Sequence, residues 1–526
     1  MSQVSETINS RWKETCGILL KGEIGGMREY EGWLSRSIRI PSMKVSSISG
    51  KPVTFVYPFL DAKSKAISLE EADYSKKFSP LGINDIKDID SILESVQERF
   101  VYCGNLYLGK SANIENSTDV FDSFYISDST QVSYSKYIAY CHNMEYNEYT
   151  FGCQNHGNSK YCINVYSVGF GNRCLEISNC NTVSDCYFSH GLRGSNDCMF
   201  CFNLRNKSNM IGNIQLTKDM YGQLKTKLLS EMREILKSKK SLPSLEDLIA
   251  GQKTDVEKAR SLVSGTKAAR TQEDISPIEK AFSDTSSLLL GKALFGIENY
   301  SAWLLEHTAK KKECKSCISS SRLDVYDYAN YLGFPENRLV SDCESESLGE
   351  LKPKGEVDGI GFSGMGKVLG QIAFYSPSFK IGECFNNIKS ELTLDSTNTY
   401  CSALNLCSKN IAKNYYILES EAIFGSNSIR RSKYCINCYF SANLSRCFEC
   451  DSCRSCEGCY FCHNVENCSD CMFCFNVKAK RYAIGNVQYS KEEYMRIKKL
   501  VLAELSTKLE KDKEFGVSIY NMGSKN

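Results

Sequence analysis

The cysteines of this chain fall on a register of three residues in two separate segments. A further eleven, from Cys435 to Cys474, follow the rule of the first segment. Between residues 130 and 215 the first set stands at Cys141, Cys153, Cys162, Cys174, Cys180, Cys186, Cys198 and Cys201. An α-helix repeats every 3.6 residues and a β-strand every two, so neither presents one face at this spacing. The register therefore indicates a chain that turns at short, regular intervals.

A longer period of twelve residues lies within this register. At about 3.3 Å per residue, twelve residues make a coil about 40 Å around, whose interior holds only small side chains. The pattern predicts a β-solenoid in which four residues per coil point inward and coils stack about 4.8 Å apart. The second segment shows the same steps from Ile411 to Ala483. In the first segment the repeating positions are Ile114, Ile126, Ile138, Thr150, Cys162, Cys174, Cys186, Cys198 and Met210.

The Cys-rich segment and its flanks occur twice. The phrase SDCMFCFN places Cys198 and Cys471 at equivalent positions, 273 residues apart, and an amphipathic helical pattern follows each copy. Upstream, the segment around Trp33 matches the segment around Trp303. These matches predict a tandem duplication.

The predicted fold class is β-rich α+β, with two modules that each have a mixed α/β head, a β-solenoid and an amphipathic closing helix. The predicted segments are a first head at 1–110, a β-solenoid at 111–216, a closing helix at 217–240, a helical linker at 241–287, a second head at 288–395, a Cys-rich β-solenoid at 396–489, a closing helix at 490–512 and a tail at 513–526.

Composition constrains partners and location. Lys plus Arg at 64 nearly balances Asp plus Glu at 62, which gives no support to a nucleic-acid or membrane partner recruited by overall charge. The polar amino-terminal sequence and the lack of a long apolar stretch favour a soluble, cytoplasmic protein that is not secreted. In that setting the 27 cysteines are expected as reduced thiols.

A thiolate metal site is the sharpest chemical hypothesis. Consecutive CxxC spacing is common among ligands of zinc, copper or iron–sulfur clusters. Buried cysteine is also simply a small hydrophobe. The first copy fills equivalent inward positions with Ile, Val, Ser, Met and Leu, which cannot replace thiolates, so packing is the favoured interpretation and no cofactor is expected. Metal would be sought only at Cys447, Cys450, Cys453, Cys456, Cys459 and Cys462.

Other motifs are weaker. Cys314 and Cys317 form a CxxC pair without a second closely spaced pair. The segment Gly361–Val368 has the spacing of a phosphate-binding loop, but Val368 stands where Ser or Thr should bind magnesium, which favours a Gly-rich turn. No recognisable catalytic motif occurs, so the chain is not expected to be an enzyme. An enzyme with its site in the heads remains an alternative without residue support.

Four tyrosines recur every twelve residues, one position before inward residues. They should stack as a ladder along one outer edge of the first solenoid, which is a candidate interaction surface. The ladder consists of Tyr125, Tyr137, Tyr149 and Tyr161.

The coil plan resembles that of beetle antifreeze proteins, which also place small residues and cysteine inward in a twelve-residue repeat. Their Thr-x-Thr face is absent here, so the resemblance implies coil geometry and not ice binding. The closing phrase CMFCFNLRNK…IGN…Q resembles that of uncharacterised Cys-rich proteins of archaeal, uncultivated-bacterial and phage genomes. That resemblance covers residues 100–236 and 395–510 and implies no activity.

Together these patterns lead to the expectation of a non-catalytic structural or scaffold protein. It would self-assemble as a homo-oligomer or a larger shell, filament or virion component, and dock protein partners through solenoid faces. The alternative is a thiolate metal or iron–sulfur protein that uses the cysteine seam of the second copy.

Overall fold

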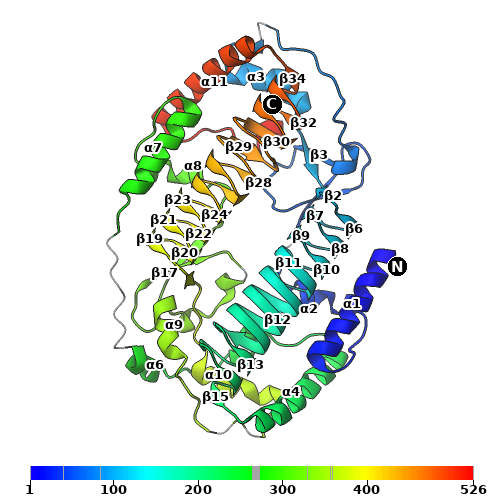
Figure 1. Ribbon diagram of the computed structural model, residues 1–526, viewed down its shortest axis with the longest axis vertical. Coiled ribbons are helices and arrows are strands. Elements are labelled where there is room, and N and C mark those ends of the chain that lie inside the picture. Colours follow the sequence, from blue (N-terminus) through cyan, green and yellow to red (C-terminus); the bar gives the residue numbers. More distant parts are fainter. Residues whose placement is uncertain are drawn as a thin grey trace. The chain divides into compact units, whose positions relative to one another are not determined.

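The computed structural model describes residues 2–39, 41–82, 85–263, 273–328, 330–355, 357 and 359–524 (Figure 1). The chain divides into two compact units that alternate along the sequence. Unit 1 comprises Met1–Ser42, Asn105–Ala269 and Lys311–Phe379. Unit 2 comprises Met43–Gly104, Arg270–Lys310 and Lys380–Asn526. Each unit contains one stack of parallel β-coils, called stack 1 and stack 2 below.

Stack 1 pairs each strand in parallel with the strand twelve residues further along. Ile138 pairs with Thr150 and Cys186 pairs with Cys198, as the twelve-residue period predicts. The predicted β-rich α/β class with parallel coils is therefore confirmed at this level. The strands are β5 (Tyr107–Leu108), β6 (Ala112–Glu115), β7 (Thr118–Phe121), β8 (Phe124–Ser127), β9 (Thr130–Ser133), β10 (Lys136–Ala139), β11 (His142–Phe151), β12 (Gln154–His190), β13 (Asn196–Met199) and β14 (Ser208–Ile211).

Stack 2 repeats this parallel arrangement. Ile417 pairs with Ile429 and Cys450 with Cys462. Its strands are β18 (Lys380–Ile381), β19 (Phe385–Ile388), β20 (Glu391–Leu394), β21 (Thr397–Tyr400), β22 (Ala403–Leu406), β23 (Lys409–Ala412), β24 (Tyr415–Leu418), β25 (Glu421–Phe424), β26 (Asn427–Arg430), β27 (Lys433–Ile436), β28 (Tyr439–Ala442), β29 (Phe448–Asp451), β30 (Tyr460–Glu466), β31 (Ser469–Met472), β32 (Phe475–Lys478) and β33 (Arg481–Ile484).

The coils turn at residues with left-handed backbone. Positive φ recurs through both stacks at the residue that directly precedes an inward position, beginning with Asn113, Asn116, Asp119 and Asp122. Asn and Asp adopt this conformation more readily than other non-glycine residues. A corner every three residues is the physical origin of the three-residue register.

Inward serines and cysteines join successive coils. Ser129 Oγ donates to the carbonyl of Ser127 (2.7 Å) and accepts from the N–H of Cys141 in the next coil (3.0 Å). Cys141 does the same, because its Sγ donates to the carbonyl of Ala139 (3.2 Å) and accepts from the N–H of Cys153 (3.3 Å). Inward hydroxyls and thiols thus provide the hydrogen bonds that backbone groups at the corners need.

Each stack ends in a short antiparallel strand and a long helix. β15 (Ile214–Gln215) pairs with β14 and precedes α4 (Lys218–Lys239); β34 (Val487–Gln488) pairs with β33 and precedes α11 (Lys491–Asp512). Thr217 and Ser490 cap these helices, since each side-chain oxygen accepts a backbone N–H three residues on. One face of each helix is buried, by Tyr221, Leu224, Leu228, Met232 and Leu236 in α4 and by Tyr494, Ile497, Val501, Leu505 and Leu509 in α11.

Further helices lie along the stacks. In Figure 1, α1 (Gln3–Leu20) runs beside stack 1, where it contacts β8, β10, β11 and β12. In unit 2, α7 (Ser276–Leu290) lies against β21, β23, β25 and β27. The other α-helices are α2 (Glu31–Ser35), α5 (Leu245–Ile249) and α6 (Val256–Val263) in unit 1, and α8 (Ser301–Leu305) in unit 2. Among the described residues, no helix is both long and apolar enough to cross a membrane.

The remaining head segments pack on the stack of the other copy. Unit 2 contains β1 (Ser42–Val45), β2 (Pro52–Phe55), β3 (Lys65–Ser68), α3 (Ile89–Val96) and β4 (Val101–Gly104), although these follow α1 in sequence. Unit 1 contains β16 (Lys311–Lys315), β17 (Arg322–Tyr326), α9 (Asp342–Leu348) and α10 (Met365–Ile372). Each predicted head is thus divided between the two units instead of forming a block beside its own solenoid.

One coil of stack 1 holds an unusually large inward side chain. His156 is buried, and neither of its ring nitrogens has a hydrogen-bond partner among the described residues. Burial lowers the pKa of His156 to about 3, which keeps the ring neutral. Gly171 lies across from it; a Cβ there would be 3.2 Å from His156 Nε2 and 2.9 Å from Val168 Cγ1. The glycine makes room for the histidine.

Gly171→Ala is therefore expected to destabilise unit 1 by about 1–3 kcal/mol, through overpacking. Adding His156→Ser should recover a substantial part of that loss, because the smaller side chain vacates the contact. Gly222→Ala is the control: a Cβ there meets nothing within 4 Å, and alanine is the better helix former. Thermal unfolding of the four proteins measures the effect; equal stability of Gly171→Ala and wild type would contradict the packing argument.

Candidate functional site

The cysteine seam of stack 2 is a buried column of thiols. All eleven side chains from Cys435 to Cys474 are buried. Cys450 Sγ contacts the carbonyl oxygens of Phe448 (3.5 Å) and Cys459 (3.4 Å). In stack 1, Ser123 Oγ contacts the carbonyls of Phe121 (2.8 Å) and Val132 (3.4 Å) at the same sequence offsets. The thiols thus occupy the hydrogen-bonding role that serine hydroxyls have in the other stack.

The electrostatics of the seam favour protonated thiols. Burial raises the pKa of Cys453 to about 12, because a thiolate there would be poorly solvated. Its Sγ donates to the carbonyls of Asp451 (3.2 Å) and Cys462 (3.3 Å). A metal would have to displace these protons and hydrogen bonds.

The six cysteines predicted as metal ligands all face inward. Cys447 and Cys459 are twelve residues apart, and Cys450 and Cys462 pair in register on successive coils. The structure therefore brings together side chains that are widely spaced in sequence. Among the residues that the structure describes, no group of three or more His, Cys, Asp or Glu has an arrangement that could hold a metal ion.

The predicted tyrosine ladder of stack 1 is present as a stack of rings. Successive ring centroids from Tyr125 to Tyr161 are 5.4, 5.0 and 4.7 Å apart. Helix α1 lies against the ladder: the Arg11 guanidinium is 5.3 Å from the Tyr137 ring, and Tyr161 Oη donates to Glu14 Oε1 (3.2 Å). The rings are half-buried. Their role as an interaction surface stays a prediction.

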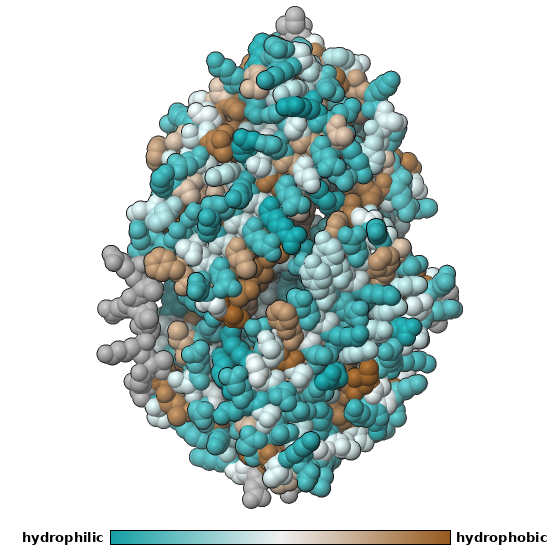
Figure 2. All heavy atoms as spheres, viewed as in Figure 1, coloured by the Kyte–Doolittle hydropathy of each residue, from teal (hydrophilic) through white to brown (hydrophobic). Residues whose placement is uncertain are grey.

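A second aromatic column on stack 1 is more exposed, and the sequence analysis missed it. Tyr134, Tyr146 and Phe170 share one corner of the coil and expose 38%, 49% and 59% of their surface. The Tyr134 and Tyr146 rings stack 4.8 Å apart and nearly parallel. Their twelve-residue spacing was the available signal. The face in Figure 2 is covered largely by hydrophilic residues with small hydrophobic groups between them, so such aromatic corners are local features of a polar surface.

A buried polar network lies on the outer face of stack 2. His463 Nδ1 is 2.7 Å from Asp451 Oδ2, and Tyr520 Oη donates to Asp451 Oδ1 (3.0 Å). His463 Nε2 accepts the backbone N–H of Cys103 (2.8 Å). Because Nε2 accepts, Nδ1 carries the proton and donates to the carboxylate. Every ring nitrogen and both carboxylate oxygens are therefore engaged, which leaves no free group for acid–base chemistry.

Glu449 lies beside this network. Its Oε1 accepts from Asn437 Nδ2 (2.8 Å) and its Oε2 accepts from the N–H of Ile519 (3.0 Å). Burial raises the pKa of Glu449 to about 8. The equivalent position in stack 1, Glu176, forms an ion pair with Arg36 (2.5 Å), and its pKa is raised by burial to about 7. Both carboxyl groups anchor segments that pack on the stacks.

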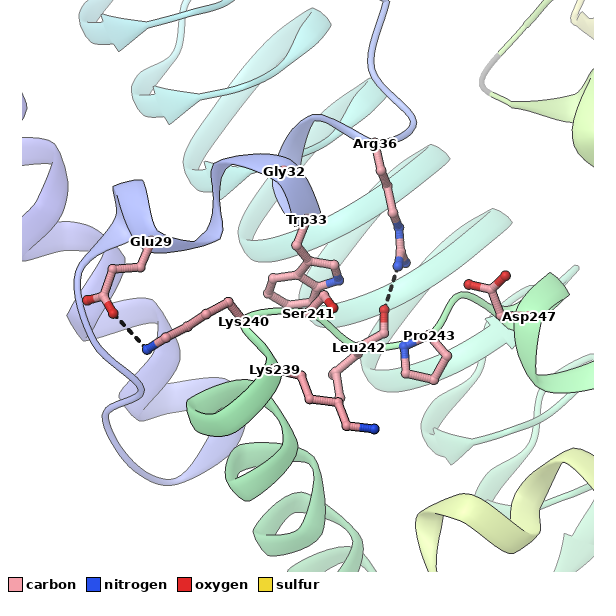
Figure 3. Close-up of a pocket in the computed structure, with 10 residues that line it drawn as sticks. All are labelled: Glu29, Gly32, Trp33, Arg36, Lys239, Lys240, Ser241, Leu242, Pro243 and Asp247. Atoms are coloured by element: carbon pink, nitrogen blue, oxygen red, sulfur yellow. Dashed lines mark hydrogen bonds and ion pairs between the residues drawn. The ribbon is translucent and has the colours of Figure 1, made fainter.

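A cleft of about 510 Å³ opens beside Trp33 in unit 1 (Figure 3). Its walls come from the Glu29–Arg36 region and from the chain that follows α4. Lys240 Nζ pairs with Glu29 Oε2 (2.7 Å), and Arg36 donates to the carbonyl of Leu242 (2.6 Å). The cleft has the size for a small ligand, but Arg36 and Lys240 are already paired.

The segment Gly361–Val368 does not form a phosphate-binding loop. Phe362–Gly364 is a short 3₁₀ turn that leads into α10. The backbone N–H of Phe362, which a phosphate would need, donates to Glu231 Oε2 (2.6 Å). A carboxylate at this place disfavours an anionic ligand.

The predicted lone CxxC pair also stays apart from a metal-site arrangement. Cys314 lies in β16 and Cys317 in the turn that follows, and both are half-buried. Burial raises the pKa of Cys317 to about 11, so the thiol is protonated at neutral pH. Comparison with known proteins adds no relative: no family model, no curated protein and no solved structure matches the chain.

Proposed function

We propose that the protein is a non-catalytic scaffold that presents the outer faces of two β-coil stacks and assembles with other copies of itself. The single observation that carries this proposal is the exposed aromatic column of Tyr134, Tyr146 and Phe170 on a stack whose interior is closed by internal hydrogen bonds. Aromatic side chains on a rigid surface provide large contact area at low conformational cost.

The free edge of each stack supports self-assembly. Among the described strands, β5 and β6 pair only with β7 and β8, and the first strands of stack 2 pair only within that stack. Phe385, in the first coil of stack 2, exposes 65% of its surface. An exposed edge with an apolar side chain is a template for pairing with another chain.

The tandem duplication is part of the proposal. Head contacts recur at equivalent positions: Ser46 Oγ donates to Glu71 Oε2 (2.7 Å), and Ser316 Oγ donates to Glu344 Oε2 (2.8 Å). Glu71 and Glu344 are 273 residues apart, as are the two cysteines of SDCMFCFN. Two similar modules in one chain would occupy quasi-equivalent positions in a symmetric assembly.

Electron microscopy of the purified protein tests the scaffold function. Wild type is expected to form ordered rings, shells or filaments, and Tyr134→Ser with Tyr146→Ser should shift the protein toward smaller species. Asn158→Ser, an exposed polar position of the same column, is the matched control and should assemble like wild type. Uniform monomers of wild type across a wide concentration range would contradict self-assembly.

A thiolate metal site is the alternative function, and the register pairing of Cys450 with Cys462 is the observation in its favour. Metal analysis of anaerobically purified protein tests it. Under the scaffold proposal, Cys456→Ser with Cys459→Val changes stability modestly and leaves metal content at background. Stoichiometric metal in wild type that is lost in this variant would establish the alternative.

A further inference from the structure

The interface between each stack and the head segment that covers it is built twice. In unit 2, Asn476 Nδ2 donates to the carbonyl of Val101 (2.8 Å), and the N–H of Cys103 donates to His463 Nε2 (2.8 Å). Between these two contacts the Tyr102 ring packs against His463, with centroids 5.2 Å apart. Residues of the first copy thus bind a stack of the second copy.

The same three contacts occur in unit 1 with the copies reversed. Asn203 Nδ2 donates to the carbonyl of Phe374 (3.0 Å), and the N–H of Ser376 donates to His190 Nε2 (3.2 Å). The Tyr375 ring lies 4.9 Å from the His190 ring. Each of these residues is 273 positions from its counterpart in unit 2. The repetition on both partners identifies one conserved docking geometry used reciprocally.

We infer that each stack carries a docking site for the head segment of the other copy, so that the chain is a covalently joined, arm-exchanged dimer of its two modules. The partner that this site recognises is a second module of the same kind, through the Asn–carbonyl, His–N–H and tyrosine contacts above. Exchange of an identical element between protomers is a common route to dimers. The inference does not depend on the scaffold function.

Glycines permit the close approach on both sides. Gly485, with φ of 51°, would place a Cβ 2.5 Å from Val96 Cγ1, and Gly212, with φ of 58°, would place one 2.4 Å from Val368 Cγ1. Any larger residue would both strain the backbone and collide with the docked head. The two glycines are 273 residues apart, so the approach belongs to the shared docking geometry.

Charge makes the docking selective between the two heads. Arg193 of stack 1 forms an ion pair with Asp342 of the second head (3.2 Å). By the 273-residue offset, the equivalents in unit 2 are Glu466 on the stack and Leu69 on the head. If the second head docked on stack 2, Asp342 would face Glu466. Like-charge juxtaposition therefore disfavours the unexchanged arrangement, as in other interfaces that reject a similar partner.

A protease site inserted between Val263 and Glu273 of the full chain tests the exchange. After cleavage of the folded protein, the two fragments are expected to remain together as a one-to-one complex in native mass spectrometry and size-exclusion chromatography, and to part only in denaturant. Separation into two folded fragments without denaturant would overturn the inference, because exchanged heads tie each fragment to the other.

Hydrogen exchange of the intact chain distinguishes exchange from any other association of the halves. Tyr102→Ser should accelerate amide exchange about tenfold or more in β30 and β32, and leave β13 unchanged; Tyr375→Ser should do the reverse. If Tyr102→Ser does not fold, Tyr102→Phe, which loses only the hydrogen bond to the carbonyl of Ile519, gives the same test with a smaller shift. Acceleration confined to the stack of the mutated head's own copy would overturn the inference.

Charge reversal tests the selectivity. Arg193→Glu is expected to lower the melting temperature of unit 1 by about 2–4 °C or more. Asp342→Arg added to it should restore most of the loss, since the pair is re-formed with opposite polarity. Leu69→Asp is the complementary variant and should destabilise unit 2 by placing a carboxylate opposite Glu466. Failure of the double variant to recover, together with no effect of Leu69→Asp, would refute charge selection between the heads.

Discussion

His463→Ala is expected to lower the free energy of unfolding of unit 2 by about 3–5 kcal/mol. The substitution removes a fully buried ring and leaves two groups without their partner: the N–H of Cys103 and one oxygen of the Asp451 carboxylate. Loss of a hydrogen bond to a buried charge costs more than loss of a neutral one. Native-state hydrogen exchange of amides in β29 and β30 measures the effect locally, which avoids assuming a single unfolding transition for two units.

The equivalent histidine of stack 1 provides a matched control. His190 Nδ1 is bonded to the hydroxyl of Ser178 (2.8 Å) instead of a carboxylate, and its Nε2 accepts the N–H of Ser376. His190→Ala therefore leaves only neutral groups unpaired and is expected to cost about 2–3 kcal/mol in unit 1. An equal cost for the two variants would show that the Asp451 carboxylate contributes nothing special to this network.

The sequence predicted the coils well because their determinants are local. Inward side chains, corners and stacking all depend on residues three or twelve positions apart, and Cys, Ser, Ile and Val mark those positions directly. The Asp451–His463 pair was visible by the same rule, since its members are twelve residues apart and directly follow the inward Cys450 and Cys462. It was missed because only the inward register was followed, whereas this pair lies on the outer face.

The exchange of heads could not be predicted from the same patterns. A duplicated sequence offers each head two similar stacks, and the hydrogen bonds from Asn203 and Asn476 go to backbone carbonyls, which carry no side-chain signature. The choice depends on a few diverged positions, such as Asp342 and Leu69, whose partners lie more than a hundred residues away. The division of the chain into consecutive modules followed sequence order, and tertiary contacts set a different grouping.

The stability of unit 2 is expected to fall as the pH rises from about 6.5 to 8, and Glu449 is the cause. Its pKa is raised to about 8 in the folded protein, against about 4.3 for an unfolded glutamate. The folded state therefore holds a proton that the unfolded state has released. A raised carboxyl pKa contributes stability that is complete below the unfolded pKa and is lost as the pH rises through the folded one.

The window from pH 6.5 to 8 separates Glu449 from the neighbouring histidine. Burial lowers the pKa of His307 to about 4, so its contribution is lost only as the pH falls below about 6.5, and it is neutral in both states above that. One retained proton corresponds to about 1.4 kcal/mol per pH unit, or about 2 kcal/mol across the window. Local unfolding free energies from hydrogen exchange in β29, at matched pH values, measure this slope.

Glu449→Gln removes the titrating group and is expected to flatten the slope in unit 2. The amide oxygen can still accept one of the two N–H groups that bind the carboxyl, from Asn437 or Ile519, so the variant begins at a lower stability but loses little more as the pH rises. Glu176→Gln should change the slope in unit 1 and leave that of unit 2 unaltered, because Glu176 lies in the other unit and pairs with Arg36. If Glu449→Gln keeps the wild-type slope in unit 2, Glu449 is ionised in the folded protein and another group must account for the pH dependence.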